Sequence, residues 1–355
     1  MKTSLKLGGA YIGLVVGVGF ASGQEILQFF GGFGIMGLAG ALVALALFAF
    51  LLMNLYQIGS RLQTQSHKEA MEYICGKPLG RVVDLMLTFF LFGTMVVMFA
   101  GANSSFEQQL GIGHSIGGMV LGVLTIITVC LGLKRVITLM SLITPVLMVI
   151  VAIIAVYALT HIQKPLAELE QIALAVPHPA PNWLLGALLY VSYNVAATAA
   201  AVVVMGGSVA NLRTAAMGGV FGGIGVGVLI LAMALVMLVQ IDVIGGSAIP
   251  TLLLSNNIAP WFGDVMLALL LVKLYCTTSG FAYTLAARCA AYGVPFRVAT
   301  VVAVVLAFIA SQVGFVKLVG LVYPAMGYLG FVLMAAIVFA WWRNRSAPLP
   351  DQQKV

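Results

Sequence analysis

Ten apolar runs separated by short polar or basic segments dominate this chain, and each is close to the length of about 20 residues that an α-helix needs to cross a bilayer. Of the residues, 62% are hydrophobic and only 8% are charged, whereas about a quarter of the residues of a soluble domain are charged. The pattern predicts an all-α polytopic membrane protein with ten transmembrane helices. The expected spans are approximately 6–30, 35–59, 80–103, 115–133, 136–159, 183–205, 214–239, 263–289, 297–313 and 316–342.

The basic residues are distributed unevenly over the loops of this topology. If alternate loops face the cytoplasm, they collect fourteen of the 17 Lys and Arg residues, the other side receives only Lys164 and Lys317, and Lys273 lies inside a span. Cytoplasmic loops are enriched in Lys and Arg, so we expect a multi-pass protein of the cell inner (plasma) membrane with both termini cytoplasmic. The net charge of +7 then reports orientation in the lipid bilayer, and no nucleic acid partner is expected.

The first span has a polar centre. In "GLVVGVGFASGQEILQFFGGFG", residues 13–34, the polar run Ser22–Glu25 interrupts an otherwise apolar stretch that is rich in glycine. Glycines let the backbone leave helical geometry, and non-helical backbone at membrane depth is tolerated only where it is buried in protein or lines a cavity. We interpret the span as a broken helix. Its free N–H groups near Ser22–Glu25 suit a carboxylate, and its free carbonyls near Gly17–Phe20 suit a cation or an ammonium, so one break would recognise a zwitterion.

Two other interpretations of this span stay open. Membrane helices also use glycines for close packing, as we expect for "GGVFGGIGVGV" in the seventh span. Alternatively, Lys2 and Lys6 followed by an apolar run and by Ala21-Ser22-Gly23 have the form of a cleaved signal peptide. The run here is longer than the core of about 7–15 residues that signal peptides use.

The chain divides into two halves of five spans within a single membrane domain, residues 1–355. The first half covers 6–159, an extracellular connection covers 160–182, the second half covers 183–342, and a cytoplasmic tail covers 343–355. Because five is odd, the second half enters the membrane in the opposite orientation, which predicts a 5+5 inverted repeat. The sixth span has a polar centre like that of the first, in "LLYVSYNVAATAAAV" at 188–202, so we expect it to be broken too.

This arrangement resembles the LeuT fold of the amino acid–polyamine–cation superfamily, and "GVGFASGQEILQFFGGFG" is similar to the corresponding stretch of the YkvI-type membrane proteins. The resemblance implies that spans 1, 2, 6 and 7 form a bundle that moves against a scaffold of spans 3, 4, 8 and 9. It also implies cation-coupled uptake of small amino-acid-like solutes.

The eighth span carries a hydroxyl cluster, Thr277, Thr278 and Ser279, in an otherwise apolar run. In the resembled fold, hydroxyls of this span and carbonyls of the first span bind sodium, which implies that Thr278 and Ser279, or Thr277 and Thr278 in the alternative register, face the carbonyls around Gly17 and Phe20. Oxygen ligands suit such a hard cation. The alternative is that these hydroxyls bond their own helix backbone or a neighbouring helix. No cofactor is expected other than a possible sodium ion.

Lys273 lies one turn before Thr277 and deep inside the eighth span. It either pairs with Glu25 across the cavity, carries a proton, or snorkels to the membrane surface. Some proton-coupled members of the resembled superfamily use a lysine on the fifth span, where this sequence has Thr144 and Pro145 instead.

Polar and adaptable side chains at the centres of three spans are candidates for binding the substrate, although packing is an alternative role for the apolar ones. The candidates are Gly19, Ala21, Ser22, Gly23, Gln24, Thr94, Met98, Tyr190, Ser192, Tyr193 and Asn194. Phe99 and Tyr323 are candidate gates, and Tyr323-Pro324 also has the form of a simple helix kink. The segment "IGGSAIPTLLLSNNIAPWFG" after the seventh span is either a lid over the external vestibule or an interfacial loop.

These features predict a secondary transporter that carries a small amino acid or related zwitterion with sodium or protons by alternating access. The alternative is a sensor or receptor subunit of the same fold that binds an amino acid without moving it. An enzyme is not expected, since the sequence has no HExxH motif and its four histidines fall in predicted loops. The four cysteines have no metal-ligand spacing, and the ATP-binding P-loop motif is absent.

Overall fold

The computed structural model of the protein describes residues 1–64, 67–113, 115–132 and 134–344, and every regular element in these ranges is a helix. The elements are α1 (Lys2–Val15), α2 (Val18–Ser22), α3 (Gln24–Phe29), the 3₁₀ helix η1 (Gly31–Phe33), α4 (Ile35–Leu62), α5 (His67–Leu110), α6 (Ile116–Leu131), α7 (Lys134–Thr160), α8 (Leu166–Leu174), α9 (Trp183–Gly207), α10 (Leu212–Val239), α11 (Ile241–Ile244), α12 (Pro250–Ile258), α13 (Pro260–Ala291), α14 (Phe296–Ala310), η2 (Ser311–Val313) and α15 (Phe315–Asn344).

The predicted spans all fall on helices. In the part of the chain that the structure describes, 8 helices are long and apolar enough to cross a membrane. The other two expected spans fall on α6, an apolar helix of 16 residues, and on the broken run α1–α3. The protein is therefore an all-α, multi-pass membrane protein, and the count of ten crossings stays a prediction.

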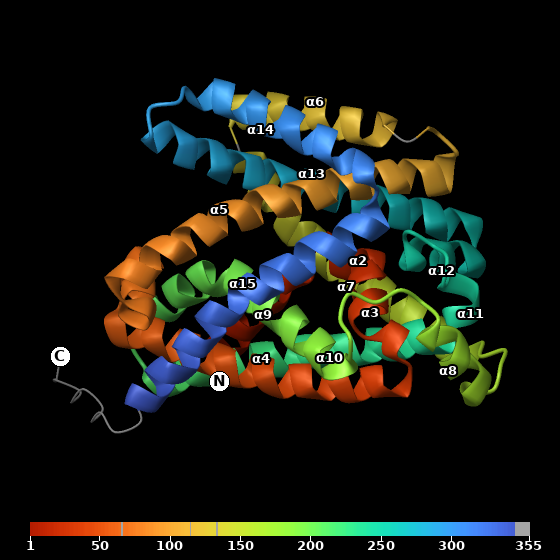
Figure 1. Ribbon diagram of the computed structural model, residues 1–355, viewed down its shortest axis with the longest axis horizontal. Helices are drawn as coiled ribbons and strands as arrows, with labels where there is room; N and C mark the ends of the chain where they lie inside the picture. The colour runs from red at the N-terminus through yellow and green to blue at the C-terminus, as the bar shows by residue number, and fades with distance from the viewer. Residues whose placement is uncertain (65–66, 114, 133, 345–355) are drawn as a thin grey trace.

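Two groups of helices make up the molecule (Figure 1). Helices α1, α4, α9 and α10, which correspond to spans 1, 2, 6 and 7, pack with one another, and so do α5, α6, α13 and α14, which correspond to spans 3, 4, 8 and 9. Helix α10 approaches α4 so closely that a Cβ atom at Gly219 or Gly223 would overlap the α4 backbone. The expected division into a bundle and a scaffold is thus visible in the packing, and its movement stays a prediction.

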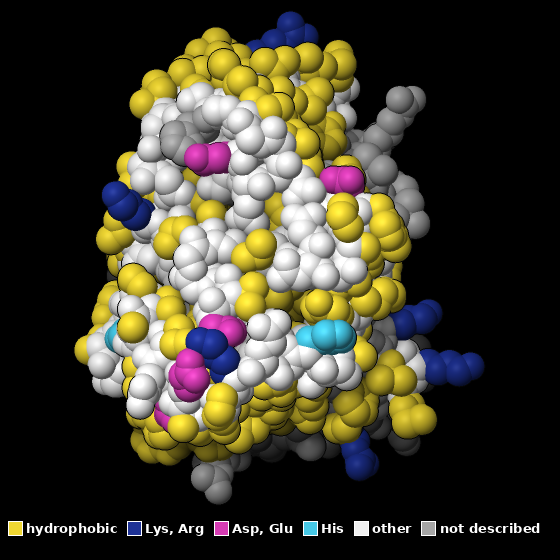
Figure 2. Space-filling view, turned by 90° about the vertical axis from the view of Figure 1, so that its right-hand side faces the viewer, with side chains coloured by type: hydrophobic (Ala, Val, Ile, Leu, Met, Phe, Trp, Pro, Cys, Tyr) yellow, Lys and Arg dark blue, Asp and Glu magenta, His cyan; other side chains and the backbone are white. Residues whose placement is uncertain are grey.

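The short helices α8, α11 and α12 gather at one end of the molecule, on the right in Figure 1. Seen from that end, the surface is a mixture of polar, acidic, basic and histidine side chains, and hydrophobic side chains cover the flanks (Figure 2). A polar end beside apolar flanks suits a protein whose flanks face lipid and whose end faces water.

Turn-forming residues set where several helices begin. The side chain of Asn182 accepts a hydrogen bond from the Leu185 N–H group at the start of α9, and Asn211 does the same for Thr214 at the start of α10. These side chains satisfy N–H groups that have no partner within the helix. Helices α12 and α13 begin instead with proline, whose fixed φ angle and missing N–H group suit a first helical position.

The expected break in the first span is confirmed. Helix α1 ends at Val15, Gly17 has extended φ and ψ angles of −90° and −169°, and α2 ends before Gly23, which has a left-handed φ of 80°. The Ser22 hydroxyl donates to the Gly19 carbonyl over 2.9 Å and accepts from the Gln24 N–H group over 3.3 Å. The polar residue at the break therefore satisfies backbone groups that the bilayer would leave without partners.

The expected break in the sixth span is wrong, because α9 runs without interruption from Trp183 to Gly207. Its central polar side chains find partners on backbone carbonyls: Asn194 Nδ2 donates to Tyr190 over 3.0 Å, and Thr198 Oγ1 donates to Asn194 over 2.7 Å. The centre of α9 has no glycine, and polar side chains that bond the preceding turn need no unwinding of the helix.

Substituting Gly23 with alanine tests the break. We expect Gly23→Ala to lower the free energy of unfolding by about 1–2 kcal/mol, because an L-residue is strained at positive φ. The added Cβ atom would also lie 3.0–3.2 Å from the side chains of Met237, Thr251 and Pro250. The matched control is Gly9→Ala in α1, where a Cβ atom meets nothing within 4 Å and where alanine stabilises a helix by about 0.5–1 kcal/mol. Equal stabilities of the two variants, measured by unfolding in mixed detergent micelles, would contradict this account.

Candidate functional site

Glu25 lies in the first turn of α3, at the break in the first span, and its side chain is only 6% exposed. The carboxylate folds back onto α2, where a Cβ atom built on Gly19 would overlap it. Its Oε2 atom accepts a hydrogen bond of 2.6 Å from the Tyr193 hydroxyl on α9. The gap that the broken helix opens is therefore filled by a carboxylate of the chain itself.

Three buried tyrosines surround this carboxylate, and we refer to Tyr190, Tyr193 and Tyr323 as the tyrosine cluster. The rings of Tyr193 and Tyr323 are stacked, with centroids 5.0 Å apart and planes 7° apart, and Tyr190 meets Tyr193 edge-on at 5.3 Å. The structure thus brings two predicted substrate residues and one predicted gate together around Glu25. Their roles in binding and gating stay predictions.

The segment between α10 and α13 covers the break, as expected of a lid. Thr251 on α12 donates a hydrogen bond of 2.6 Å from its Oγ1 atom to the Ala21 carbonyl, and its side chain borders Gly23. Gln108 on α5 holds the start of this helix, because its amide accepts from the Ile249 N–H group and donates to the Ile249 carbonyl, each over 3.0 Å. The sequence did not single out Thr251, since a threonine in an apolar loop carries no signal of its own.

Four other predicted substrate residues lie outside the tyrosine cluster: Ser192, Asn194, Thr94 and Met98. The Ser192 hydroxyl donates to the Gly327 carbonyl of α15 over 2.8 Å, and the Asn194 amide bonds within α9, so both side chains already have partners. Thr94 on α5 contacts the Met326 sulfur of α15 at 3.8 Å, and Met98 is buried one turn further along α5. Their contact with a substrate stays a prediction.

Phe99 lies apart from the tyrosine cluster, and its role as a gate stays a prediction. Its ring packs edge-on against Phe308 of α14, with centroids 6.3 Å apart, and borders Gly122 of α6. This face of α5 meets the scaffold helices, whereas the tyrosine cluster lies on α9 and α15. The sequence placed Phe99 in the correct span but did not show in which direction it points.

The hydroxyl cluster of α13 is buried without hydrogen bonds. The hydroxyl oxygens of Thr277, Thr278 and Ser279 have no hydrogen-bond partner among the described residues, and α13 packs against α2. On the same helix, Thr284 shows the ordinary behaviour of a membrane hydroxyl, since it donates to the Gly280 carbonyl one turn earlier over 2.8 Å. The alternative that the three hydroxyls bond their own helix is therefore not realised. Three buried oxygens without partners are a donor set that fits a hard cation.

The carbonyls predicted to share the ion belong to α2 and to Gly17 just before it, and α2 packs against α13. The Gly17 carbonyl accepts from the Ala21 N–H group over 3.0 Å, and the Phe20 carbonyl accepts from the Gly23 N–H group over 3.1 Å. A carbonyl oxygen has two lone pairs, so each keeps the capacity to coordinate an ion. The predicted ligands are thus chemically able to hold sodium, and the ion itself stays a prediction.

Lys273 is buried, with 1% of its surface exposed, and its Nζ atom donates to the Thr144 hydroxyl of α7 over 3.0 Å. The snorkelling alternative is therefore wrong. The expected pair with Glu25 is also wrong in this conformation: among the described residues the two form no ion pair, since Lys273 turns toward α7 and Glu25 turns toward α9. A role as a proton carrier stays a prediction. Thr144, beside a mid-span proline, is a partner that the sequence did not identify.

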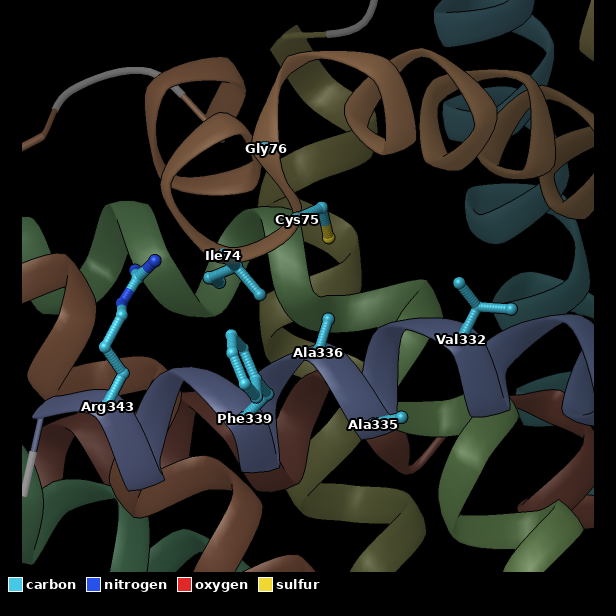
Figure 3. Close-up of a pocket in the computed structure, with 8 residues that line it drawn as sticks. All are labelled: Ile74, Cys75, Gly76, Val332, Ala335, Ala336, Phe339 and Arg343. Carbon is cyan, nitrogen blue, oxygen red and sulfur yellow. The ribbon is translucent and has the colours of Figure 1, made fainter.

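A separate cavity of about 520 Å³ lies between the N-terminal part of α5 and the C-terminal half of α15 (Figure 3). Apolar side chains such as Ile74 and Phe339 line it, and Arg343 lies at one end. None of the residues that line it belongs to the tyrosine cluster or to the hydroxyl cluster. The cavity is therefore distinct from the site at the helix break.

Solved transporter structures share this architecture. The chain matches MhsT in complex with L-phenylalanine with a TM-score of 0.57 at 17% identity, over 95% of this chain and 98% of that one. It matches inward-facing Mhp1, a nucleobase-cation-symport-1 family transporter, with a TM-score of 0.62 at 13% identity, over 98% of this chain and 78% of that one. A manganese transporter of Eremococcus coleocola matches with a TM-score of 0.54 at 16% identity, over 96% and 78% of the two chains. The protein is thus a multi-pass membrane protein with the LeuT fold.

Two Bacillus subtilis (strain 168) proteins are similar in sequence over nearly the whole chain. The uncharacterized membrane protein YkvI is 27% identical over 330 residues, which are 92% of this chain and 93% of YkvI. The uncharacterized protein YyaD is 27% identical over 333 residues, which are 92% of this chain and 94% of YyaD. No family model matches the chain. The resemblance to YkvI that the first span suggested is therefore confirmed.

The contact between Lys273 and Thr144 predicts an asymmetry between two substitutions. Thr144→Val removes the acceptor and leaves a buried ammonium, so we expect it to lower the free energy of unfolding by about 1–3 kcal/mol. Lys273→Met removes the ammonium and keeps an apolar side chain of similar length, so we expect a change within about 1 kcal/mol or a gain. The double variant should be as stable as Lys273→Met. An equal loss of unfolding free energy in both single variants, measured by unfolding in detergent, would show that the hydrogen bond from Lys273 to Thr144 does not stabilise the buried ammonium.

Proposed function

We propose that this protein is a secondary active transporter that moves a small amino-acid-like solute together with a cation by alternating access. The observation that carries the proposal is the broken first span, where interrupted backbone and a buried carboxylate lie at membrane depth in a fold that known transporters use. Polar and ionisable groups inside a membrane are costly, and they usually mark a path for a substrate or an ion. The solute and the cation are moved and not chemically changed.

Sodium is the coupling ion that the hydroxyl cluster supports. Thr278 and Ser279, or Thr277 and Thr278 in the alternative register, would hold it together with the carbonyls of Gly17 and Phe20. A bound sodium ion would satisfy two of the three buried hydroxyl oxygens and draw α2 and α13 together. Protons are the alternative, with Lys273 and Glu25 as the residues that would carry them.

The proposed orientation follows from the basic residues. Both termini would face the cytoplasm of a cell whose plasma membrane contains the protein, and the end with α8, α11 and α12 would face outward (Figure 2). In this orientation, α12 closes the external route to Glu25.

Thermal unfolding in sodium and potassium salts tests the cation site. We expect sodium to raise the unfolding temperature of the wild-type protein, because a ligand stabilises the state to which it binds. Thr278→Ala and Ser279→Ala should lose this response, and the matched control Thr284→Ala, on the same helix but already hydrogen-bonded, should keep it. If sodium and potassium have equal effects on the wild type, the sodium assignment is wrong.

Uptake into proteoliposomes separates a transporter from a sensor. A transporter accumulates a labelled solute when an inward gradient of the coupling ion is imposed, and accumulation stops when that gradient collapses. A sensor of the same fold is stabilised by its ligand but accumulates none. Accumulation that follows a proton gradient, with no effect of sodium, would assign the coupling to protons.

A further inference from the structure

The charges at the helix break narrow the class of substrate, an inference that rests on the proposed function. We propose that the solute is an organic amine cation whose ammonium group binds the Glu25 carboxylate within the tyrosine cluster, and that no carboxylate is required on the solute. The place expected for a solute carboxylate is unsuitable, Glu25 has no positive partner among the described residues, and the surrounding groups suit an ammonium.

The place expected for a solute carboxylate is the N-terminal end of α3. This helix has only 6 residues, and Glu25 already puts a negative charge in its first turn. The Gln24 N–H group donates to the Ser22 hydroxyl. A solute carboxylate here would meet a carboxylate of like charge, and the positive helix end that would attract it is already complemented.

Glu25 has no positive partner among the described residues. The elements packed against α3 are α2, η1, α9, α10 and α15, and the groups they turn toward the carboxylate are tyrosine hydroxyls. The sequence of α9 contains no Lys or Arg, Arg213 of α10 lies in the first turn of that helix, and Lys317 near the start of α15 is exposed. Lys273 is turned toward Thr144. A buried carboxylate in a membrane protein requires either a proton or a cation, and the described residues supply no cation, so a bound ammonium would take that place.

The surrounding groups suit an ammonium. Aromatic faces attract cations, and the stacked rings of Tyr193 and Tyr323 lie beside the carboxylate together with Tyr190. Besides the carboxylate, two oxygens that can each accept a hydrogen bond, the Tyr190 hydroxyl and the Gln24 Oε1 atom, are buried without hydrogen-bond partners in the described part of the chain. A primary ammonium brings three donors and no acceptor, so it complements this set.

Gly19 sets the position of the Glu25 carboxylate. Because a Cβ atom at Gly19 would overlap the Glu25 carboxylate, the carboxylate lies directly against the α2 backbone. Gly19→Ala would push the carboxylate away from α2 without changing its charge. This substitution therefore tests the position of the carboxylate separately from its charge.

The experiment compares compounds that share a carbon skeleton and differ in charged groups. The probes are valine, isobutylamine and isovalerate, then phenylalanine, phenethylamine and 3-phenylpropionate, then alanine, ethylamine and propionate. For each compound, the concentration that half-saturates the shift in unfolding temperature is measured on the purified full-length protein. We expect at least one amine to bind at least tenfold more tightly than its parent amino acid, and the carboxylates to have no effect.

Substitutions locate the binding. Glu25→Gln keeps the shape of the side chain and removes its charge, so it is expected to fold and to weaken amine binding at least tenfold. Gly19→Ala is expected to weaken it as well. The matched control is Glu168→Gln, the same change at an exposed salt bridge with Lys164, and it should bind as the wild type does. If Glu25→Gln does not fold, Gly19→Ala and Glu25→Asp carry the test in its place.

Three outcomes would overturn the inference. Tighter binding of an amino acid than of its amine would show that the solute carboxylate contributes, and the proposed transporter would stand with a zwitterionic substrate. Unchanged amine binding in Glu25→Gln or Gly19→Ala would place the amine elsewhere. Absence of binding by every amine would also reject it, while the sodium and uptake experiments would still decide the proposed function independently.

Discussion

The interior of a bilayer offers no water to a backbone that leaves the helix, and this constraint governs the centre of the structure. On either side of α2, at Val16–Gly17 and at Gly23, the first span gives up regular helix, so each freed group has to be met from within the protein. The Ser22 hydroxyl serves two of these groups, and Thr251 reaches from α12 to serve the Ala21 carbonyl. Helix α12 therefore stabilises the break, because without Thr251 the Ala21 carbonyl would have no hydrogen-bond partner at membrane depth.

The fold was predictable because the bilayer imposes length and the loops impose charge. Apolar runs predicted the position of every long helix, although α5 begins at His67, well before the expected start at 80, and the glycines and polar residues of 17–25 predicted the break in the first span. A similar polar run at Ser192–Asn194 wrongly predicted a break in the sixth span. A polar side chain in a span either serves a broken backbone or bonds the turn before it, as Asn194 and Thr198 do, and composition alone does not separate the two. The glycines present in one span and absent from the other were the distinguishing feature.

The candidate site was predictable as a set of residues but not as an arrangement. The rotation of each helix about its axis depends on packing, which places Phe99 against α6 and α14 and turns Lys273 toward Thr144 instead of Glu25. Sequence spacing put Lys273 and Thr277 on one face of a helix, yet it did not show which neighbour that face meets. Tyr323 was identified through its proline neighbour, and only the structure shows that its ring stacks on Tyr193 beside the carboxylate.

Helix α2 lies between the buried Glu25 carboxylate and the hydroxyl cluster of α13. Its backbone lies against the Glu25 carboxylate at Gly19, and α2 also packs against α13, which carries the three unpaired hydroxyls. Gly17 and Gly23 bound this segment of 5 residues, so it joins its neighbours through backbone that is not helical. In the proposed transporter, a cation bound at α13 and an ammonium bound at Glu25 would both lie next to α2. Coupling between solute and ion then needs no long path through the protein, since a shift of α2 changes both sets of ligands at once.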